Sequence, residues 1–66
     1  MITVNGATEA LAAPTVAALL EARGIAAGAK GVAVALNGAV VPRAAWAETT
    51  LSAGDAVEII KAMSGG

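Results

Sequence analysis

Two Asn-Gly pairs place strong limits on the fold of this chain. Each pair directly follows a short segment in which large apolar residues alternate with smaller or polar ones, the period of a strand with one buried face. Asn-Gly between apolar segments is the strongest short signal for a two-residue type I′ turn, because both residues tolerate positive φ angles. The sequence therefore predicts two β-hairpins. Asn5-Gly6 joins Ile2–Val4 to a strand at Ala7–Leu11, and Asn37-Gly38 joins Val32–Leu36 to a short strand at Val40-Val41.

A helix is predicted between the two hairpins. Thr15 is a suitable N-cap, and the large apolar residues of the segment Val16–Leu20 fall on one face at helical spacing. Gly24 supplies the left-handed residue that ends a helix, and Ile25 then folds back onto the last turn as in a Schellman motif. Arg23 in the last turn suits the negative end of the helix dipole.

The remaining elements complete an α+β domain. Pro42 cannot donate to a strand ladder and ends the fourth strand. Arg43–Ala47 is predicted as a helical turn, Ala53–Asp55 as a turn and Val57–Lys61 as the last strand. The predicted order is β-β-α-β-β-β, a mixed sheet of about five short strands with one helix packed on one face. Residues 1–61 form the domain, and residues 62–66 form a C-terminal tail.

Length and composition narrow the function classes. With 66 residues, the chain is near the lower size limit for a domain that folds without disulfides or metals. It has neither Cys nor His, and its net charge of -1 offers no basic patch for nucleic acid. The longest apolar runs have five residues, whereas a membrane span needs about 20. Without a signal-peptide pattern at the start, we expect a soluble, cytoplasmic protein that binds neither nucleic acid nor membranes.

The residues usually used for catalysis are scarce. No pair of the acidic residues has catalytic or metal-ligand spacing, and His, Cys and Tyr are absent. The chain is therefore not expected to be an enzyme or to bind a metal. Trp46, the only aromatic residue, is expected to cap one end of the core. Arg43 is either a surface contact or part of a structural ion pair. The acidic residues are Glu9, Glu21, Glu48, Asp55 and Glu58.

The sequence ends in Ser64-Gly65-Gly66. A carboxylate on glycine is the least hindered acyl group that a protein offers, and two glycines adopt backbone angles closed to other residues. Such a tail fits a channel too narrow for side chains and delivers its carboxylate to another protein's active site. The alternative is that Gly65-Gly66 is an inert, frayed end.

The ordered series of motifs resembles the ThiS family, the sulfur carriers of thiamine biosynthesis. Ser64 is instead similar to the related MoaD family, whose members are longer, richer in Phe and carry prolines before the tail. Ala17 and Ala18 stand where the ThiS family often has acidic residues, so a charged contact from that helix face is in doubt. The resemblance rests on Ile2–Gly6, Val16–Leu20, Val32–Gly38, Val41-Pro42-Arg43, Trp46, Leu51, Gly54-Asp55, Glu58-Ile59-Ile60 and Gly65-Gly66.

This resemblance implies a ubiquitin-like β-grasp fold and a definite chemistry. An E1-like adenylating enzyme, similar to ThiF or MoeB, uses ATP and Mg²⁺ to convert the Gly66 carboxylate to an acyl-adenylate. A sulfur-donor relay protein with a persulfide then supplies the sulfur of a Gly66 thiocarboxylate. A ThiG-like thiazole synthase takes this sulfur to build the thiazole ring. The carrier itself binds no cofactor; it supplies Gly66 and threads Gly65 and Ser64 into its partner.

Two alternatives remain beside this function. One is another β-grasp role, as a MoaD-like or other sulfur carrier or as a ubiquitin-like modifier. The other is an interaction module whose Gly-Gly tail is inert.

The last strand also predicts where a partner docks. If Val57 and Ile59 face the helix, Glu58 and Ile60 lie on the opposite face of the sheet, together with Ala33 and Ala35 of the third strand. An exposed apolar patch on a small protein usually marks a partner site. The candidate docking residues are Ile60, Glu58, Lys61, Met63 and Arg43.

Overall fold

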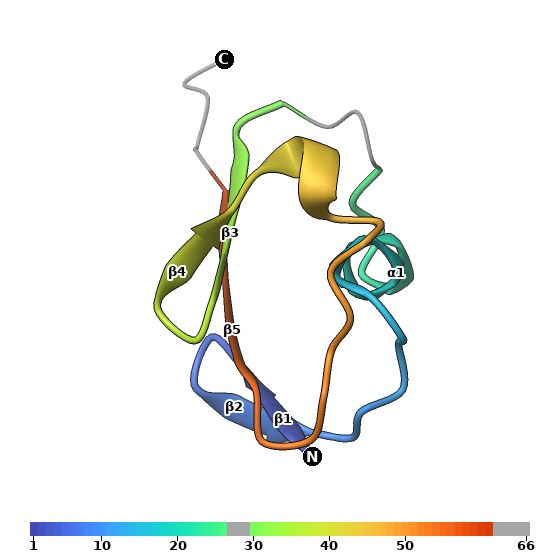
Figure 1. Cartoon of the computed structure of the whole chain (residues 1–66), viewed down its shortest axis with the longest axis vertical. Coiled ribbons are helices and arrows are strands. Elements are labelled where there is room, and N and C mark those ends of the chain that lie inside the picture. Colours follow the sequence, from blue (N-terminus) through green and yellow to red (C-terminus); the bar gives the residue numbers. More distant parts are fainter. Residues whose placement is uncertain (27–29, 62–66) are drawn as a thin grey trace.

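The structure of the chain, a computed structural model, describes residues 1–26 and 30–61. Its elements follow the predicted order, with one helix facing a five-stranded sheet (Figure 1). They are β1 (Ile2–Val4), β2 (Ala7–Glu9), α1 (Val16–Ala22), β3 (Val32–Leu36), β4 (Ala39–Val41), the 3₁₀ turn η1 (Arg43–Ala45) and β5 (Ala56–Lys61).

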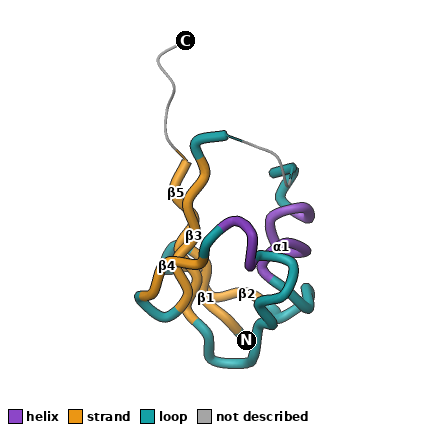
Figure 2. Tube along the Cα trace, turned by 45° about the horizontal axis from the view of Figure 1, so that its top comes forward, coloured by secondary structure: helices purple, strands orange, loops and turns teal. Residues whose placement is uncertain are grey.

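The sheet is mixed, and its strands lie in the order β2-β1-β5-β3-β4. β1 and β5 run parallel, while every other neighbouring pair is antiparallel. The last strand of the chain therefore lies in the centre of the sheet, between the two hairpins. α1 lies across one face of the sheet, and the segment from η1 to β5 closes one side of the space between them (Figures 1 and 2). The predicted α+β architecture of a β-grasp fold is confirmed.

Both Asn-Gly pairs form the predicted hairpin turns. Asn5 and Gly6 have φ angles of 52° and 84°, and Asn37 and Gly38 have φ angles of 51° and 85°. Two successive positive φ angles are the signature of a type I′ turn, whose twist matches that of the flanking strands. The strand pairs that close on these turns are Val4 with Ala7 and Leu36 with Ala39.

The prediction that the second strand extends to Leu11 is wrong. The hairpin register places Glu9 opposite Ile2, so β1 has no further strand residue to pair with the chain beyond Glu9. Leu11 lies in the connection to α1 with 38% of its surface exposed. The first helical turn after β4 is also shorter than predicted, since η1 ends at Ala45.

We expect Gly38→Val to lower the free energy of unfolding by about 1–3 kcal/mol, because a β-branched residue is strained at a φ of 85°. No neighbouring atom lies within 4 Å of the added Cβ, so backbone strain alone would cause the loss. Ala39→Val, which adds the same side chain at the adjacent, exposed strand position, serves as the control. Chemical denaturation of both variants measures the difference. An unchanged stability of Gly38→Val would contradict the strain assigned to this turn.

The helix begins and ends as predicted. Thr15 is the N-cap, and its Oγ1 accepts a hydrogen bond from the Ala18 amide at 3.2 Å. At the other end, Ile25 N donates to Leu20 O at 2.9 Å and Gly24 N donates to Glu21 O at 3.0 Å. These are the two hydrogen bonds of a Schellman motif, and Gly24 has the left-handed φ of 79° that it requires.

The segment after η1 holds the N-terminal end of the helix. Val16 N donates to Thr49 O and Ala17 N donates to Trp46 O, each at 3.0 Å. These amides belong to the first helical turn, where no partner exists within the helix. The long connection between β4 and β5 is therefore fastened to α1 by backbone hydrogen bonds.

The core lies between the sheet and this helix. Trp46 is buried, as predicted, and its indole Nε1 donates to Val41 O at 2.9 Å, which satisfies its single polar atom. The buried side chains of α1 belong to one hydrophobic cluster with those of β3 and β5. The buried residues are Ile2, Val4, Val16, Leu19, Leu20, Ile25, Val34, Val41, Trp46, Leu51 and Val57.

Asp55 closes the turn before β5. Its carboxylate accepts hydrogen bonds from Asn37 Nδ2 at 3.0 Å and from Ser52 N at 2.8 Å. The bond from Asn37, followed by that from Ser52, lowers the pKa of Asp55 below its ordinary value of 3.8. Because the folded state holds the ionised form, this carboxylate stabilises the fold at pH values above 3.8, and the stabilisation disappears as the pH falls through the lower, folded pKa.

We therefore expect Asp55→Asn to flatten the decline of stability with acidification below pH 3.8. The variant should also be less stable than the wild type at neutral pH, because an amide replaces the ionised acceptor. Unfolding free energies measured across this pH range test both points. An unchanged slope in the variant would assign the acid sensitivity to other carboxylates.

Candidate functional site

β5 presents different side chains to the two faces of the sheet. Val57 and Ile59 face α1, where Val57 is buried and Ile59 packs against the core. Glu58 and Ile60 face the other way, and Ile60 is 57% exposed. The strand alternates as the sequence predicted, and its last residue, Lys61, returns to the helix side.

The open face of the sheet carries an apolar patch. Ile60 pairs with Ala33 on β3, and Glu58 pairs with Ala35, so these four residues share one face. Ala35 also pairs with Val40 on β4, and Val40 is 76% exposed. We call Ile60, Ala33, Ala35 and Val40 the sheet patch. Glu58 is the charged residue beside it.

Val40 was not among the predicted docking residues. Its position follows from the two-residue turn, because Leu36 opposes Ala39 across the hairpin and Ala35 therefore opposes Val40. Counting across Asn37-Gly38 would have placed Val40 on the same face as Ala35.

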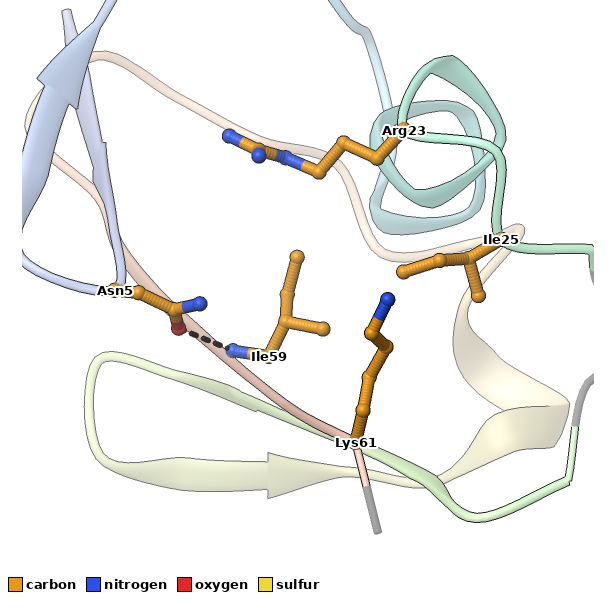
Figure 3. A pocket seen from close by; sticks show the side chains of 5 residues that line it. All are labelled: Asn5, Arg23, Ile25, Ile59 and Lys61. Atoms are coloured by element: carbon orange, nitrogen blue, oxygen red, sulfur yellow. Dashed lines mark hydrogen bonds between the residues drawn. The ribbon is translucent and has the colours of Figure 1, made fainter. Parts of the chain in front are cut away.

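A groove of about 270 Å³ lies on the opposite, helix side of β5. Figure 3 shows Arg23 extending from the end of α1 and Lys61 from the end of β5 around Ile59, with Asn5 and Ile25 on either side. Arg23 forms an ion pair with Glu9 of β2. Lys61 thus lies on the face opposite Ile60, and these two predicted docking residues do not belong to one surface.

Asn5 forms hydrogen bonds with β5 beyond the end of its pairing with β1. The parallel pairing of β1 with β5 ends at Val4 and Val57, and Asn5 N then donates to Val57 O at 2.9 Å. Beyond this point, Asn5 Oδ1 accepts a hydrogen bond from Ile59 N at 2.8 Å (Figure 3). The side chain replaces a strand partner, so it aligns the part of β5 that leads to the tail.

Arg43 has a contact within the chain. Its guanidinium carbon lies 5.2 Å from the centre of the Trp46 ring, a cation–π arrangement. Arg43 was expected to make either a surface contact or an ion pair, and the stacking on Trp46 was not foreseen. The predicted tail residues Ser64, Gly65 and Gly66, and the docking candidate Met63, lie outside the described residues.

The described residues offer little for metal chemistry. Within residues 1–26 and 30–61, no three carboxylate side chains lie close enough together to hold a metal ion. In the same part of the chain, no helix has the length and apolar character needed to cross a membrane. What these residues provide is a pair of surfaces on either side of the last strand.

The comparisons with known proteins agree on one family. The sequence model of the ThiS family matches residues 2–66. The crystal structure of the thiamine biosynthesis protein ThiS from Geobacter metallireducens is 43% identical, with a TM-score of 0.75 over 98% of this chain and 97% of that chain. An NMR solution structure of a thiamine biosynthesis protein from the same organism is also 43% identical, with a TM-score of 0.76 over 98% of this chain and 86% of that one.

No curated protein sequence matches the chain. The family match nevertheless covers almost its whole length, and the likeness to the two solved structures extends over the same region. The motifs noted in the sequence, the β-grasp architecture and these matches lead to the same result. The chain belongs to the ThiS family of small sulfur-carrier proteins.

Proposed function

We propose that this chain carries sulfur, as a thiocarboxylate on Gly66, to the synthesis of the thiazole ring of thiamine. The observation that supports this most directly is the match to the ThiS family over residues 2–66, which includes Gly65-Gly66. The described part of the chain is compatible with a carrier, because the open face of its sheet exposes an apolar patch that a partner could cover.

The chemistry begins with a poor electrophile. A carboxylate does not react with a sulfur nucleophile, because oxide would have to leave. An E1-like adenylating partner uses Mg-ATP to attach AMP to the Gly66 carboxylate, with release of pyrophosphate. A persulfide sulfur then attacks the acyl carbon and displaces AMP, and cleavage of the sulfur–sulfur bond by a thiol leaves the thiocarboxylate. ATP and Mg²⁺ belong to the partner in this scheme.

In this sequence of reactions, the role of the carrier is to position Gly66. β5 ends at Lys61, five residues before Gly66, and it is held on one side by β3 up to the pair Val32–Lys61. On the other side, beyond the end of β1, the Asn5 side chain accepts a hydrogen bond from Ile59 N. A strand fastened on both sides gives the tail a defined starting point relative to the sheet patch, so that docking of the patch would direct Gly66 into the partner's active site.

The test is an intact mass of the protein. We expect incubation with an E1-like partner, Mg-ATP and a persulfide sulfur source to add the mass difference between sulfur and oxygen, and omission of ATP to prevent it. Subsequent incubation with thiazole synthase and the substrates that accept the sulfur should restore the original mass, whereas molybdopterin synthase with its own acceptor substrate should leave the thiocarboxylate in place. A protein whose mass never changes in the complete mixture would refute the proposal.

A further inference from the structure

The groove on the helix side of β5 gathers hydrogen-bond donors. Its five described lining side chains comprise the Lys61 ammonium, the Arg23 guanidinium and the Asn5 amide, together with Ile25 and Ile59. Lys61 and Arg23 extend into the same space from opposite sides (Figure 3). None of these five side chains is acidic. The groove is thus shaped for an anionic group, with an apolar floor below it.

Glu9 neutralises part of this charge. Its carboxylate pairs with the Arg23 guanidinium, and the side chains of the two residues are 35% and 38% exposed. An ion pair at this exposure is weak and exchanges readily with water or with another anion. Lys61 therefore brings a positive charge to the groove beyond the one that Glu9 balances.

The apolar floor favours a side chain over a bare ion. Ile25 is buried at the end of α1, and Ile59 packs against the core, so both present fixed aliphatic surface. A glutamate that enters the groove would lay its methylene groups on these two isoleucines while its carboxylate meets Lys61 and Arg23. An inorganic anion would use the cations alone.

The place of the groove in the fold suggests its partner. Lys61 is the last residue of β5, so the groove lies immediately before the tail begins, on the face opposite the sheet patch. We propose that it binds an acidic side chain of the adenylating partner, as a second contact that grips the end of β5 from the helix side. This inference rests on the proposed function, because it takes that enzyme as the protein that receives the tail.

The test compares steady-state kinetics of adenylation with the carrier as the varied substrate. Lys61→Glu should raise the KM for the carrier about tenfold and leave kcat unchanged, because a like charge then faces the partner's carboxylate. Lys61→Ala should raise it about threefold and weaken the increase of KM with salt concentration. Lys30→Glu makes the same change of net charge at an exposed residue that does not line the groove, and should alter KM less than twofold.

The outcomes separate this inference from the proposed function. A wild-type chain that is never adenylated would refute both. If the wild type is adenylated normally and the KM of Lys61→Glu is unchanged, the proposed role of the groove is refuted and the proposed function is not. If Lys30→Glu raises the KM for the carrier as much as Lys61→Glu does, the effect is general charge steering. If Lys61→Glu raises the KM for ATP and not that for the carrier, the groove binds a nucleotide phosphate. Either result overturns the inference. Thermal melting of each variant confirms that its fold is intact.

Discussion

Addition of a single alanine after Gly66 is expected to abolish thiocarboxylate formation. The extra residue moves the terminal carboxylate one residue beyond the position that the partner would adenylate, and it places a methyl group on the carbon next to the reacting carboxyl carbon. Deletion of Gly66 should have the same effect for the opposite reason, because the carboxylate then falls short. Both variants are assayed by intact mass after incubation with the E1-like partner, Mg-ATP and a persulfide source.

The fold should not change in either variant. Among the described residues, every buried hydrophobic side chain lies between Ile2 and Val57, so neither variant changes a residue of this core. We therefore expect the melting temperatures of both variants to equal that of the wild type. A loss of activity with an intact fold would assign the effect to the position of the carboxylate.

Two substitutions within the tail refine the test. Gly65→Val should also prevent adenylation, since a β-branched residue restricts the backbone and widens the segment that must enter a narrow channel. Ser64→Ala is the matched control, because it removes only a hydroxyl group and leaves the segment narrow, and it should retain activity. Full activity of the chain with the added alanine would contradict the carrier function itself.

The sequence predicted the local elements of the fold more fully than their connections. Thr15 and Gly24 mark the ends of α1 because capping depends on residues within one or two turns of each other. The Asn-Gly turns were predictable for the same reason. The length of β2 was not, because it depends on where β1 begins, and that limit appears only once the register of the hairpin is known.

The asparagines of the two turns show this difference most clearly. Their positive φ angles follow from the local sequence, but their side chains also accept hydrogen bonds from β5. Asn5 Oδ1 accepts from Ile59 N, which is 54 residues away, and Asn37 Oδ1 accepts from Ala56 N at 2.9 Å. These bonds arise because β5 lies between the two hairpins, an arrangement that local patterns do not reveal. The groove beside Lys61 escaped the sequence reasoning for the same reason, since it joins residues from β1, α1 and β5.

The sheet patch was partly predictable. Strand alternation placed Ile60 and Glu58 on one face with Ala33 and Ala35, and the register of β3 with β5 confirms this placement. The same alternation sends Lys61 to the other face, so the predicted docking residues Ile60 and Lys61 lie on opposite faces of the sheet.

Ile60→Asp is expected to weaken binding to the adenylating partner at least tenfold, which corresponds to about 1.4 kcal/mol. Ile60 and Val40 are the large apolar side chains exposed on the sheet patch, and a partner that covers the patch would remove both from water. An aspartate at position 60 would lose this gain and would bring a charge into a desolvated interface, beside the existing charge of Glu58.

The stability of the domain should change little in this variant. Ile60 is 57% exposed and lies outside the core, so its replacement removes few contacts within the folded chain. Leu11→Asp is the matched control: Leu11 is also a large apolar residue, 38% exposed, but it lies in the connection between β2 and α1 and not on the sheet patch. This control should bind the partner with unchanged affinity.

Calorimetric titration of the partner with each variant, together with thermal melting, distinguishes the possible results. Weak binding by Ile60→Asp with normal binding by Leu11→Asp would assign docking to the sheet patch. Equal weakening by both variants would show that any added negative charge impairs association. Normal binding by Ile60→Asp would place the docking surface elsewhere. Because the patch and the groove lie on opposite faces of β5, a partner that uses both would enclose the strand at the point where the tail begins. The double variant Ile60→Asp/Lys61→Glu should then bind the partner more weakly than either single variant.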